Sequence, residues 1–349
     1  MPSKLSTIKY ESREVICSVC IANYNGVNYL SDCIESVLMQ EFDEGQIEII
    51  VHDDASEDNS VDYIRTNYPF VRLIESASNV GFCVSNNRMV SEAKGKCILL
   101  LNNDAVLNDD AILTLYAAWL EYGEGIYGLP QYDATSGKLI DMGSTFDLFL
   151  NPVPNLDSSK HDVGMVTGAC LWLSKSLWEN LGGFPDWFGS LAEDTFICCY
   201  ARLRGFPVKV VPGSGYDHWV GANFGGGKLV DEKKLVTSIE RRSLSERNKS
   251  YVMVLSYPTI ALIVILPIHI LFLMFEGLLL SIIKKDIKIF WLIYWNCVKC
   301  IWSEKGRLIK RRKLIHRISN INAKEFFRPF SMFPYKLHMI IRFGIPAIR

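Results

Sequence analysis

Short apolar runs alternate with amphipathic segments along the first hundred residues of the chain. Four apolar runs have the length and composition of strands, at 15–22, 47–51, 71–75 and 98–101. Three segments between them have apolar residues at helical spacing, at 29–40, 60–68 and 86–93. This alternation predicts an α/β fold with a mainly parallel sheet and right-handed crossovers. Residues 131–165, rich in Gly, Pro, Asp and Ser, predict a long insertion over one end of the sheet.

Polar residues follow three of the predicted strands at the point where each strand ends. These clusters are Asn23 to Asn25, Asp53 with Asp54, and Asn102 to Asp104. Ligands of open α/β sheets bind outside the carboxyl ends of the parallel strands. A carboxylate fixed there can hold a hard divalent cation, and the cation can hold a diphosphate. Ordinary Asn/Asp turns are the alternative for each cluster taken singly.

Charge divides the chain into an acidic part and a basic part. Residues 241–349 hold 20 Lys/Arg against 5 Asp/Glu, which leaves 17 against 33 for residues 1–240. The basic part is also strongly apolar, because 251–275 contains no charged residue and 287–302 contains only Lys288 and Lys299. This combination favours an anionic membrane over nucleic acid as the partner of the basic residues. We therefore expect a catalytic domain at 1–240 and a helical membrane-association region at 241–349.

The mode of membrane attachment is less constrained by the pattern. A single crossing would separate the basic tail from the acidic domain, which the positive-inside tendency disfavours. The apolar run up to residue 283 is too short for two crossings of about 20 residues each. Pro258 and Pro267 can break this run into a re-entrant or in-plane element, which is the arrangement we favour. Lys and Arg at 305–317 then contact anionic lipid, and a solvated basic helix is the alternative.

Ten cysteines occur without the pattern of a disulfide framework. Cys17 with Cys20, and Cys297 with Cys300, have CxxC spacing, but both pairs lie in apolar stretches. Buried or membrane-facing thiols are therefore expected, in a reducing compartment. The first 15 residues contain no apolar core, so no signal peptide is expected.

Several motifs together resemble the family 2 glycosyltransferases. In chain order they are VCIANYNG, IIVHDDASEDNS, NVGFCVSNNRMVSEAKGKCILLLNNDAVL, TGACLWLSK, GGFPDW, AEDTFICCYARLRGF and GYDHWVG, which span about residues 15–222. The resemblance is to the non-processive, rhamnosyltransferase-like members. It implies a GT-A fold, that is, a Rossmann-like and mainly parallel sheet, followed here by the membrane-associated helical tail.

The resemblance also implies which residues bind the sugar donor. Asp53 matches the residue that contacts the nucleotide base and ribose, and Asn23 and Asn25 fall in the same pocket. Asn102 and Asp104 occupy the DxD motif, whose first aspartate is replaced by asparagine here. One carboxylate and one amide still suit a divalent cation, Mg²⁺ or Mn²⁺, because water and phosphate supply its other ligands.

A second group of matching residues lies further along the chain. Gly81 and Asn87 match a loop and helix near the donor, for which a structural turn is the alternative. Asp194, preceded by Glu193, matches the general base of an inverting transfer, and its alternative is a helix N-cap. Glu193 is expected to orient the acceptor. His218 matches a late histidine that completes the metal shell or touches the diphosphate.

These implications combine into one expected activity. A nucleotide-diphosphate sugar donates its sugar, with inversion, to a polyprenyl-linked glycan at the cytoplasmic face of the cell membrane. The chain lacks the Gln-x-x-Arg-Trp motif of processive synthases, which predicts one sugar per encounter. The alternatives are a sugar-1-phosphate nucleotidyltransferase and a non-catalytic membrane scaffold that retains the fold.

Overall fold

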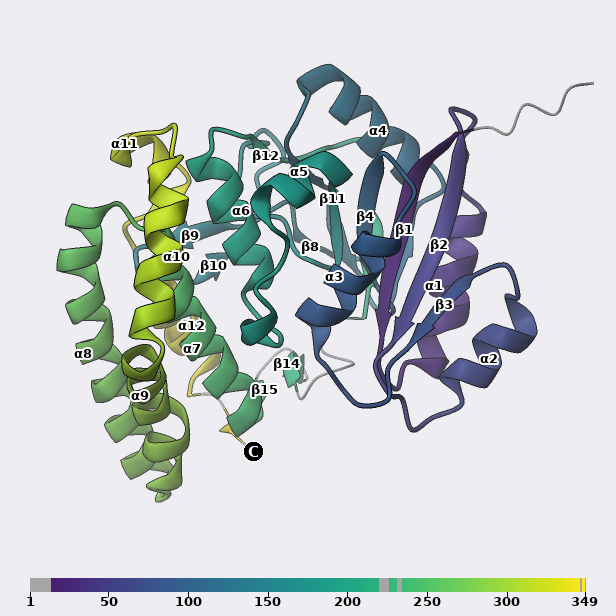
Figure 1. Ribbon diagram of the computed structural model, residues 1–349. Coiled ribbons are helices and arrows are strands. Elements are labelled where there is room, and N and C mark those ends of the chain that lie inside the picture. Colours follow the sequence, from purple (N-terminus) through teal and green to yellow (C-terminus); the bar gives the residue numbers. More distant parts are fainter. Residues whose placement is uncertain (1–13, 220–225, 231–233, 346, 349) are drawn as a thin grey trace, which may run out of the picture.

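A seven-stranded sheet forms the centre of the computed structural model, which describes residues 14–348 apart from 220–225, 231–233 and 346 (Figure 1). All neighbouring strands are parallel except β11, which runs antiparallel to both β4 and β6. The strand order across the sheet is β12 (Val208–Val210), β6 (Ile126–Gly128), β11 (Cys170–Ser174), β4 (Cys97–Asn102), β1 (Val15–Asn23), β2 (Gln46–Asp53) and β3 (Arg72–Glu75). This arrangement confirms the predicted α/β fold with a mainly parallel sheet.

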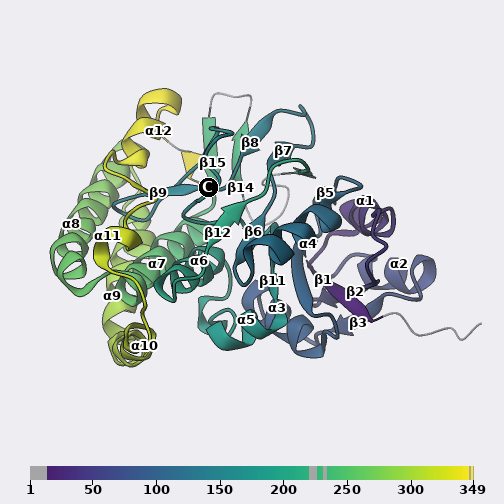
Figure 2. The same cartoon turned by 90° about the horizontal axis from the view of Figure 1, so that it is seen from above.

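Helices cover both faces of this sheet, as Figure 2 shows from above. One layer contains α1 (Val27–Leu38), α2 (Ser60–Asn67) and α4 (Ala111–Tyr122), and the other contains α3 (Phe82–Glu92), α5 (Lys175–Leu181) and α6 (Glu193–Leu203). Because successive strand residues point to opposite faces, β4 sends Ile98 and Leu100 into one core and Leu99 and Leu101 into the other. The continuous apolar run that marked this strand in the sequence is therefore explained by burial on both sides.

The predicted strands and helices of the first hundred residues are all present, with ends displaced by a few residues. The largest displacement is in α3, which begins at Phe82 rather than at the predicted residue 86. Gly81 precedes this helix with φ = 88°, a left-handed conformation that glycine adopts without steric cost. The helical spacing of apolar residues did not include this first turn, because it faces the site described below.

Short strands surround the carboxyl end of the sheet. The predicted insertion contains β7 (Gln131–Asp133), β8 (Leu139–Asp141), β9 (Thr145–Asp147) and β10 (Pro152–Val153). One small sheet has the order β5 (Ala105–Leu107), β13 (Tyr216–His218), β7 and β8, and it aligns His218 with Ala105. A second has the order β10, β9 and β16 (Phe330–Ser331), and a third consists of β14 (Gly226–Val230), β15 (Lys234–Thr237) and β17 (Ala347–Ile348). These pairings tie distant segments to the rim of the central sheet.

The last third of the chain is mainly helical and packs against α6 (Figure 1). Its elements are α7 (Ile239–Ser256), α8 (Thr259–Lys284), a π-helix η2 (Phe290–Trp295), α9 (Asn296–Ser303), α10 (Lys305–Arg317), α11 (Ala323–Phe326) and α12 (Tyr335–Phe343). Buried residues 251–255 of α7 belong to the same core as α3, α5 and α6. The boundary at residue 240 therefore stays a prediction, since one core crosses it.

The apolar run at 251–275 is divided between two different environments. Residues 251–256 end α7 inside the core, and Pro258 caps the start of α8. Pro267 does not break the run, contrary to our expectation, because it lies within a helix that continues for 26 residues. Exposed apolar side chains surround Pro267. A proline within a helix removes one backbone hydrogen bond, and the other turns of this long helix remain helical. Within the described residues, α8 is the single helix long and apolar enough to cross a membrane.

All ten cysteines are free thiols in the structure. Cys17, Cys20 and Cys297 are buried, and Cys300 is half-buried. The two CxxC pairs therefore form no disulfide, in agreement with the expectation of buried thiols. Burial raises the pKa of the Cys97 and Cys170 thiols to about 12, so these side chains behave as small apolar groups of the core.

Candidate active site

A cavity of about 610 Å³ opens at the carboxyl ends of β1, β2 and β4. Strand-end residues line one part of it, among them Asn23, Asn25, Asn102 and Asp104. Glu193 and Asp194, at the start of α6, line the same cavity. The structure thus brings together two acidic segments ninety residues apart in the sequence. The remaining lining residues are Ala22, Tyr24, Asp54, Asn79, Gly81, Phe82, Ser85, Asn103, Thr167, Gly168, Ala169, Ser190, Leu191, His218 and Arg241.

A buried hydrogen-bond network fixes the strand ends on the side of β1 and β2. The side-chain amide nitrogen of Asn23 donates to the Asp53 carboxylate at 2.8 Å. The side-chain amide nitrogen of Asn103 donates to the side-chain oxygen of Asn23 at 2.7 Å. Asp53 also accepts from the backbone N–H and hydroxyl of Ser56, at 2.9 and 2.7 Å. Asp53 is therefore behind the cavity wall rather than among the lining residues, and its contact with a nucleotide stays a prediction.

Asp54, its neighbour, lines the cavity, although the sequence indicated it only as part of a strand-end cluster and gave it no role of its own. Its two carboxylate oxygens accept hydrogen bonds from the backbone N–H groups of Val80 and Gly81, at 2.6 and 2.8 Å. A Cβ atom on Gly81 would lie 3.0 Å from the carbonyl oxygen of Gly189. This glycine therefore serves both the turn and a close backbone approach, and Asp54 holds that turn against the cavity.

Asn87 lies outside the cavity lining. Its amide donates to the carbonyl oxygen of Phe184 at 2.8 Å and to Asp186 at 2.6 Å, and its oxygen accepts from Phe184 N–H at 3.0 Å. Asn87 fastens the loop at 184–186, which packs beside α3. Its proximity to the donor stays a prediction, and a structural role in this turn accounts for all three hydrogen bonds. Asn25, which does line the cavity, accepts from the N–H of Glu57 at 2.8 Å.

Asp104 and His218 form a close pair on the β4 side of the cavity. The Nε2 atom of His218 lies 3.0 Å from Oδ1 of Asp104 and 3.5 Å from the amide of Asn102. The Nδ1 atom lies 3.0 Å from the amide nitrogen of Gln131. If Gln131 donates to Nδ1, the neutral imidazole carries its proton on Nε2 and donates it to Asp104. Metal binding at Nε2 would require the other tautomer, in which Gln131 turns its oxygen towards Nδ1.

The Asp104–His218 pair fits a divalent cation as a partial ligand set. Both side chains are less than one fifth exposed and aim at the same cavity. Among the described residues there is no cluster of three or more His, Cys, Asp or Glu side chains arranged for a metal. Mg²⁺ and Mn²⁺ sites in transferases commonly combine one or two protein ligands with phosphate oxygens and water. Asp104 and His218 fit the protein part of such a site.

Glu193 and Asp194 begin α6 after two residues with left-handed backbone conformation. Leu191 and Ala192 have φ = 70° and 63°, and Ala192 is the N-cap. The N-cap alternative for Asp194 is therefore wrong, because Asp194 lies within the first turn. Its carboxylate accepts from the N–H of Thr195 at 2.6 Å and from that of Gly168 at 3.3 Å.

Burial changes the protonation behaviour of both acids. It raises the pKa of Asp194 above its ordinary value, and burial together with the Asp194 charge raises the pKa of Glu193. The Oε2 atom of Glu193 has no hydrogen-bond partner within the part of the chain that the structure describes. A buried acceptor of this kind costs free energy unless a ligand satisfies it. A raised carboxyl pKa near a cavity is typical of proton-transfer sites.

Arg241 adds a cation to the cavity and was missed by the sequence reasoning. It comes from the first turn of α7, which follows Ser238, whose hydroxyl accepts from Arg241 N–H at 3.1 Å. Burial lowers the pKa of Arg241, and the Glu193 carboxylate opposes that effect. A guanidinium stays charged under these conditions and can bind phosphate oxygens. No motif marked Arg241, because it follows the last matching segment.

Asn248, also on α7, holds the loop that leads into Glu193. Its fully buried amide group donates to three backbone carbonyl oxygens, those of Phe188 at 3.0 Å, Ser190 at 2.8 Å and Leu191 at 2.8 Å. Arg247 donates to the same Phe188 oxygen at 2.8 Å. The strained backbone before the acidic pair is thus held from the C-terminal helices, a contact that sequence spacing could not reveal.

Solved structures of several glycosyltransferases share this GT-A fold. A structure of GalNAc-T7 with UDP, GalNAc and Mn²⁺ has a TM-score of 0.54 at 15% identity, covering 70% of this chain and 49% of that one. A mannosyltransferase from Pyrobaculum calidifontis, with GDP-Man and Mn²⁺, has a TM-score of 0.51 at 15% identity, covering 83% and 88%. S. aureus TarS 1-349 has a TM-score of 0.51 at 16% identity, covering 69% and 66%. At these identities, the likeness establishes the fold.

Sequence comparison agrees with this fold. Residues 18–182 match the family model described as "Glycosyl transferase family 2", so this segment, just under half of the chain, is a family 2 glycosyltransferase domain. A poly(ribitol-phosphate) beta-glucosyltransferase of Bacillus spizizenii is 28% identical over 210 residues, covering 58% of this chain and 31% of the relative. Glycosyltransferase GlyG of Streptococcus pneumoniae is 34% identical over 104 residues, covering 29% and 34%. The chain thus spans about a third of the length of these curated relatives.

Proposed function

We propose that this chain is an inverting glycosyltransferase that uses a nucleotide-diphosphate sugar. The observation that carries the proposal is one cavity lined both by the Asp104–His218 pair and by Glu193 with Asp194. The first pair suits a cation-bound diphosphate, and the second suits removal of a proton from an acceptor hydroxyl. The mannosyltransferase and GalNAc-T7 structures contain a nucleotide or nucleotide sugar and Mn²⁺, which supports the same donor class here.

Donor binding uses the strand-end residues in this proposal. Asp104 and His218 would hold a divalent cation, which would neutralise charge on the departing diphosphate as a Lewis acid. Asn23, Asn25 and Asp54 surround the nucleotide end, with Asp53 fixing Asn23 from behind. Arg241, which also lines the cavity, provides a second positive charge for phosphate oxygens.

Asp194 acts as the general base in this proposal. The acceptor hydroxyl attacks the anomeric carbon from the face opposite the diphosphate, and Asp194 takes its proton as the new bond forms. The N–H groups of Gly168 and Thr195 keep the Asp194 carboxylate in one orientation. The unsatisfied Glu193 oxygen accepts a hydrogen bond from the acceptor and positions it. The resulting product has the inverted anomeric configuration.

The acceptor is proposed to be a lipid-linked glycan at the cytoplasmic membrane face. An exposed apolar helix, α8, and the basic residues that follow it in sequence support membrane association. The name of one curated relative gives poly(ribitol phosphate) as its acceptor, which supports a polymeric acceptor or its precursor here. The assay below compares lipid-linked with soluble acceptors.

A product assay with a matched variant tests this function. The purified chain is incubated with UDP-sugars and GDP-sugars, with Mn²⁺ or Mg²⁺, and with lipid-linked or soluble acceptors. We expect release of nucleoside diphosphate, and loss of turnover by at least about 10³-fold in Asp194→Asn with donor binding retained. Release of pyrophosphate from a nucleoside triphosphate would indicate the nucleotidyltransferase instead. Equal behaviour of wild type and Asp194→Asn would indicate the non-catalytic scaffold.

A further inference from the structure

Helix α8 has two faces of opposite character along its whole length. Its outward face consists of exposed apolar side chains at helical spacing, among them Ile263, Leu271, Phe275 and Ile282, which are 65–74% exposed. Its inward face, including His269, Leu273, Gly277 and Leu280, is buried against the protein. Figures 1 and 2 show α8 at the outer edge of the helical bundle, with α7 between it and α6.

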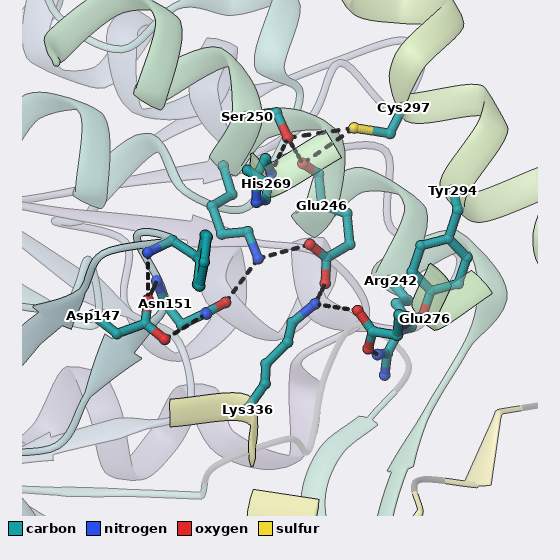
Figure 3. A network of polar contacts seen from close by, with 12 residues as sticks. Asp147, Asn151, Arg242, Glu246, Ser250, His269, Glu276, Tyr294, Cys297 and Lys336 are labelled. Carbon is teal, nitrogen blue, oxygen red and sulfur yellow. Dashed lines mark hydrogen bonds and ion pairs between the residues drawn. The ribbon is translucent and has the colours of Figure 1, made fainter. Parts of the chain in front are cut away.

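A buried ionic cluster ties the inward face of α8 to α7 and α12 (Figure 3). The carboxylate of Glu276, on α8, accepts from Arg242 at 2.5 Å and from Lys336, on α12, at 2.8 Å. Lys336 also donates to Glu246 at 2.5 Å, and Glu246 forms an ion pair with Lys249 at 2.7 Å. The successive helices α7 and α8 and the distant α12 are therefore joined by charges that are mostly buried.

Polar contacts also continue on both sides of this cluster. Towards the start of α8, the His269 ring lies 2.9 Å from the hydroxyl of Ser250 on α7. Towards its end, Ser281 accepts from the N–H of Phe290 at 3.0 Å, and Gly277 packs directly on the Tyr294 ring. The inward face of α8 is thus attached from residue 269 to residue 281, not merely at one end.

These attachments exclude α8 from crossing a bilayer while it keeps this packing. Its partner α7 is held to the catalytic loop by Asn248 and to the core by residues 251–255, so α7 cannot enter a membrane. A spanning α8 would have to leave α7, which would expose Glu276 to hydrocarbon and strand Arg242 in the protein. Charged side chains in hydrocarbon carry a high free-energy cost.

We propose that α8 lies flat in the surface of an anionic bilayer, with its outward face in the lipid and its inward face on the protein. The proposal rests on the membrane association inferred above and specifies its geometry. A helix of 26 residues presents an apolar stripe about 39 Å long in this position. The catalytic cavity then remains on the same side of the membrane as both ends of α8.

The neighbouring segments match the chemistry of an anionic membrane surface. Trp291, Trp295 and Trp302 are 45–71% exposed, and tryptophan is enriched where lipid headgroups meet hydrocarbon. The Lys305 ammonium lies 3.8 Å from the centroid of the Trp302 ring. Helix α10, which begins at Lys305, carries seven Lys and Arg residues and no acidic residue, so it complements negative lipid headgroups.

Vesicle flotation tests the surface. The full-length protein is floated with phosphatidylcholine vesicles, with or without phosphatidylglycerol, at low and high salt. We expect at least about tenfold tighter binding to the anionic vesicles, weakening as salt is raised. Leu271→Glu and Phe275→Glu should each reduce binding about tenfold or more, because they place a charge in lipid. Leu120→Glu, on the equally exposed Leu120 of α4, is the matched control and should bind like wild type.

Labelling of introduced cysteines then tests the geometry. Asp43→Cys reports the side of the catalytic domain, and Lys288→Cys reports the end of α8; both positions are exposed. In sealed membrane vesicles of known orientation, an impermeant maleimide should label both variants from the same side, above the wild-type background. Labelling from opposite sides would overturn the proposal and establish a spanning helix.

Three further outcomes distinguish this proposal from a dimer interface and from the proposed activity. Failure to bind any vesicle, with a dimer that Leu271→Glu dissociates, would assign the apolar face to a second copy and overturn the proposal. Membrane binding without nucleoside diphosphate release from any donor would contradict the proposed activity but not the proposed membrane geometry. Release of nucleoside diphosphate by a protein that binds no vesicles would support the proposed activity and overturn the proposed membrane geometry.

Discussion

Replacement of Asn248 by alanine tests whether α7 positions the catalytic loop. The Asn248 amide supplies the hydrogen bonds to the carbonyl oxygens of Phe188, Ser190 and Leu191, and its side chain is fully buried. Its two protons are shared among three acceptors. Losing about two net hydrogen bonds costs about 1–3 kcal/mol, and buried carbonyls left without a partner add to this. We expect the free energy of unfolding to fall by about 2–4 kcal/mol.

Asn248→Ala should also lower turnover, because it releases the backbone of the loop before Glu193. Leu191 and Ala192 both have positive φ, and each such residue costs about 1–2 kcal/mol relative to ordinary backbone. The hydrogen bonds from Asn248 are of similar size, so their loss allows the loop to relax and shifts Glu193 and Asp194. A displacement of about 1 Å in a reacting group lowers the rate by about 10²-fold. We expect kcat to fall about 10–100-fold while the donor KM changes little.

The assay compares Asn248→Ala with Asn296→Ala, each measured well below its melting temperature. Asn296 lies in the same helical bundle and donates one 3.3 Å hydrogen bond to Ser243, away from the loop. Its variant should lose less than about 1 kcal/mol of stability and keep its kcat. Full kcat in a destabilised Asn248→Ala enzyme would show that Asn248 only stabilises the fold and does not position the catalytic loop. An equal loss of kcat in both variants would contradict the positioning role as well.

Three other predictions concern the cavity itself. Because burial raises the pKa values of Glu193 and Asp194, and the base acts when deprotonated, the pH–rate profile should rise through a pKa above the ordinary carboxyl value of about 4; a rate that stays flat down to about pH 4 would contradict this. Gly81→Ala should lower the melting temperature more than Gly137→Ala in a thermal scan, since both have positive φ but only Gly81 meets a backbone oxygen at 3.0 Å. His218→Gln should weaken the Mn²⁺-dependent thermal shift with nucleoside diphosphate about tenfold in metal concentration, and an unchanged shift would remove His218 from the metal site.

Much of the central sheet could be predicted from the sequence, because local pattern and long-range packing agree there. The strand at 97–102 is buried on both faces, and its continuous apolar run reports this directly. Asp104 and Asp194 reached one cavity as expected, since motifs at strand and helix ends have fixed positions in an α/β fold. The start of α3 was predicted too late, because its first turn serves the cavity rather than the core.

The rest of the site depends on contacts that spacing does not encode. Asp53 and Asp54 are adjacent and chemically alike, yet only the second lines the cavity. Successive residues of an extended segment point to opposite sides, and the two carboxylates belong to separate hydrogen-bond networks. Arg241 and Asn248 reach the site from a helix that sequence composition assigned to the membrane-association region. Pro267 was expected to help break the apolar run into a re-entrant or in-plane element, but it lies within one continuous helix of 26 residues.

The anomeric configuration of the first product, followed by NMR, shows whether the sugar is transferred in a single inverting displacement. We expect inversion, because in the proposed mechanism the Asp104–His218 pair binds the leaving diphosphate while Asp194 activates the acceptor hydroxyl for attack from the opposite face of the sugar. A product that retains the donor configuration from the earliest time point would contradict this single displacement across the cavity.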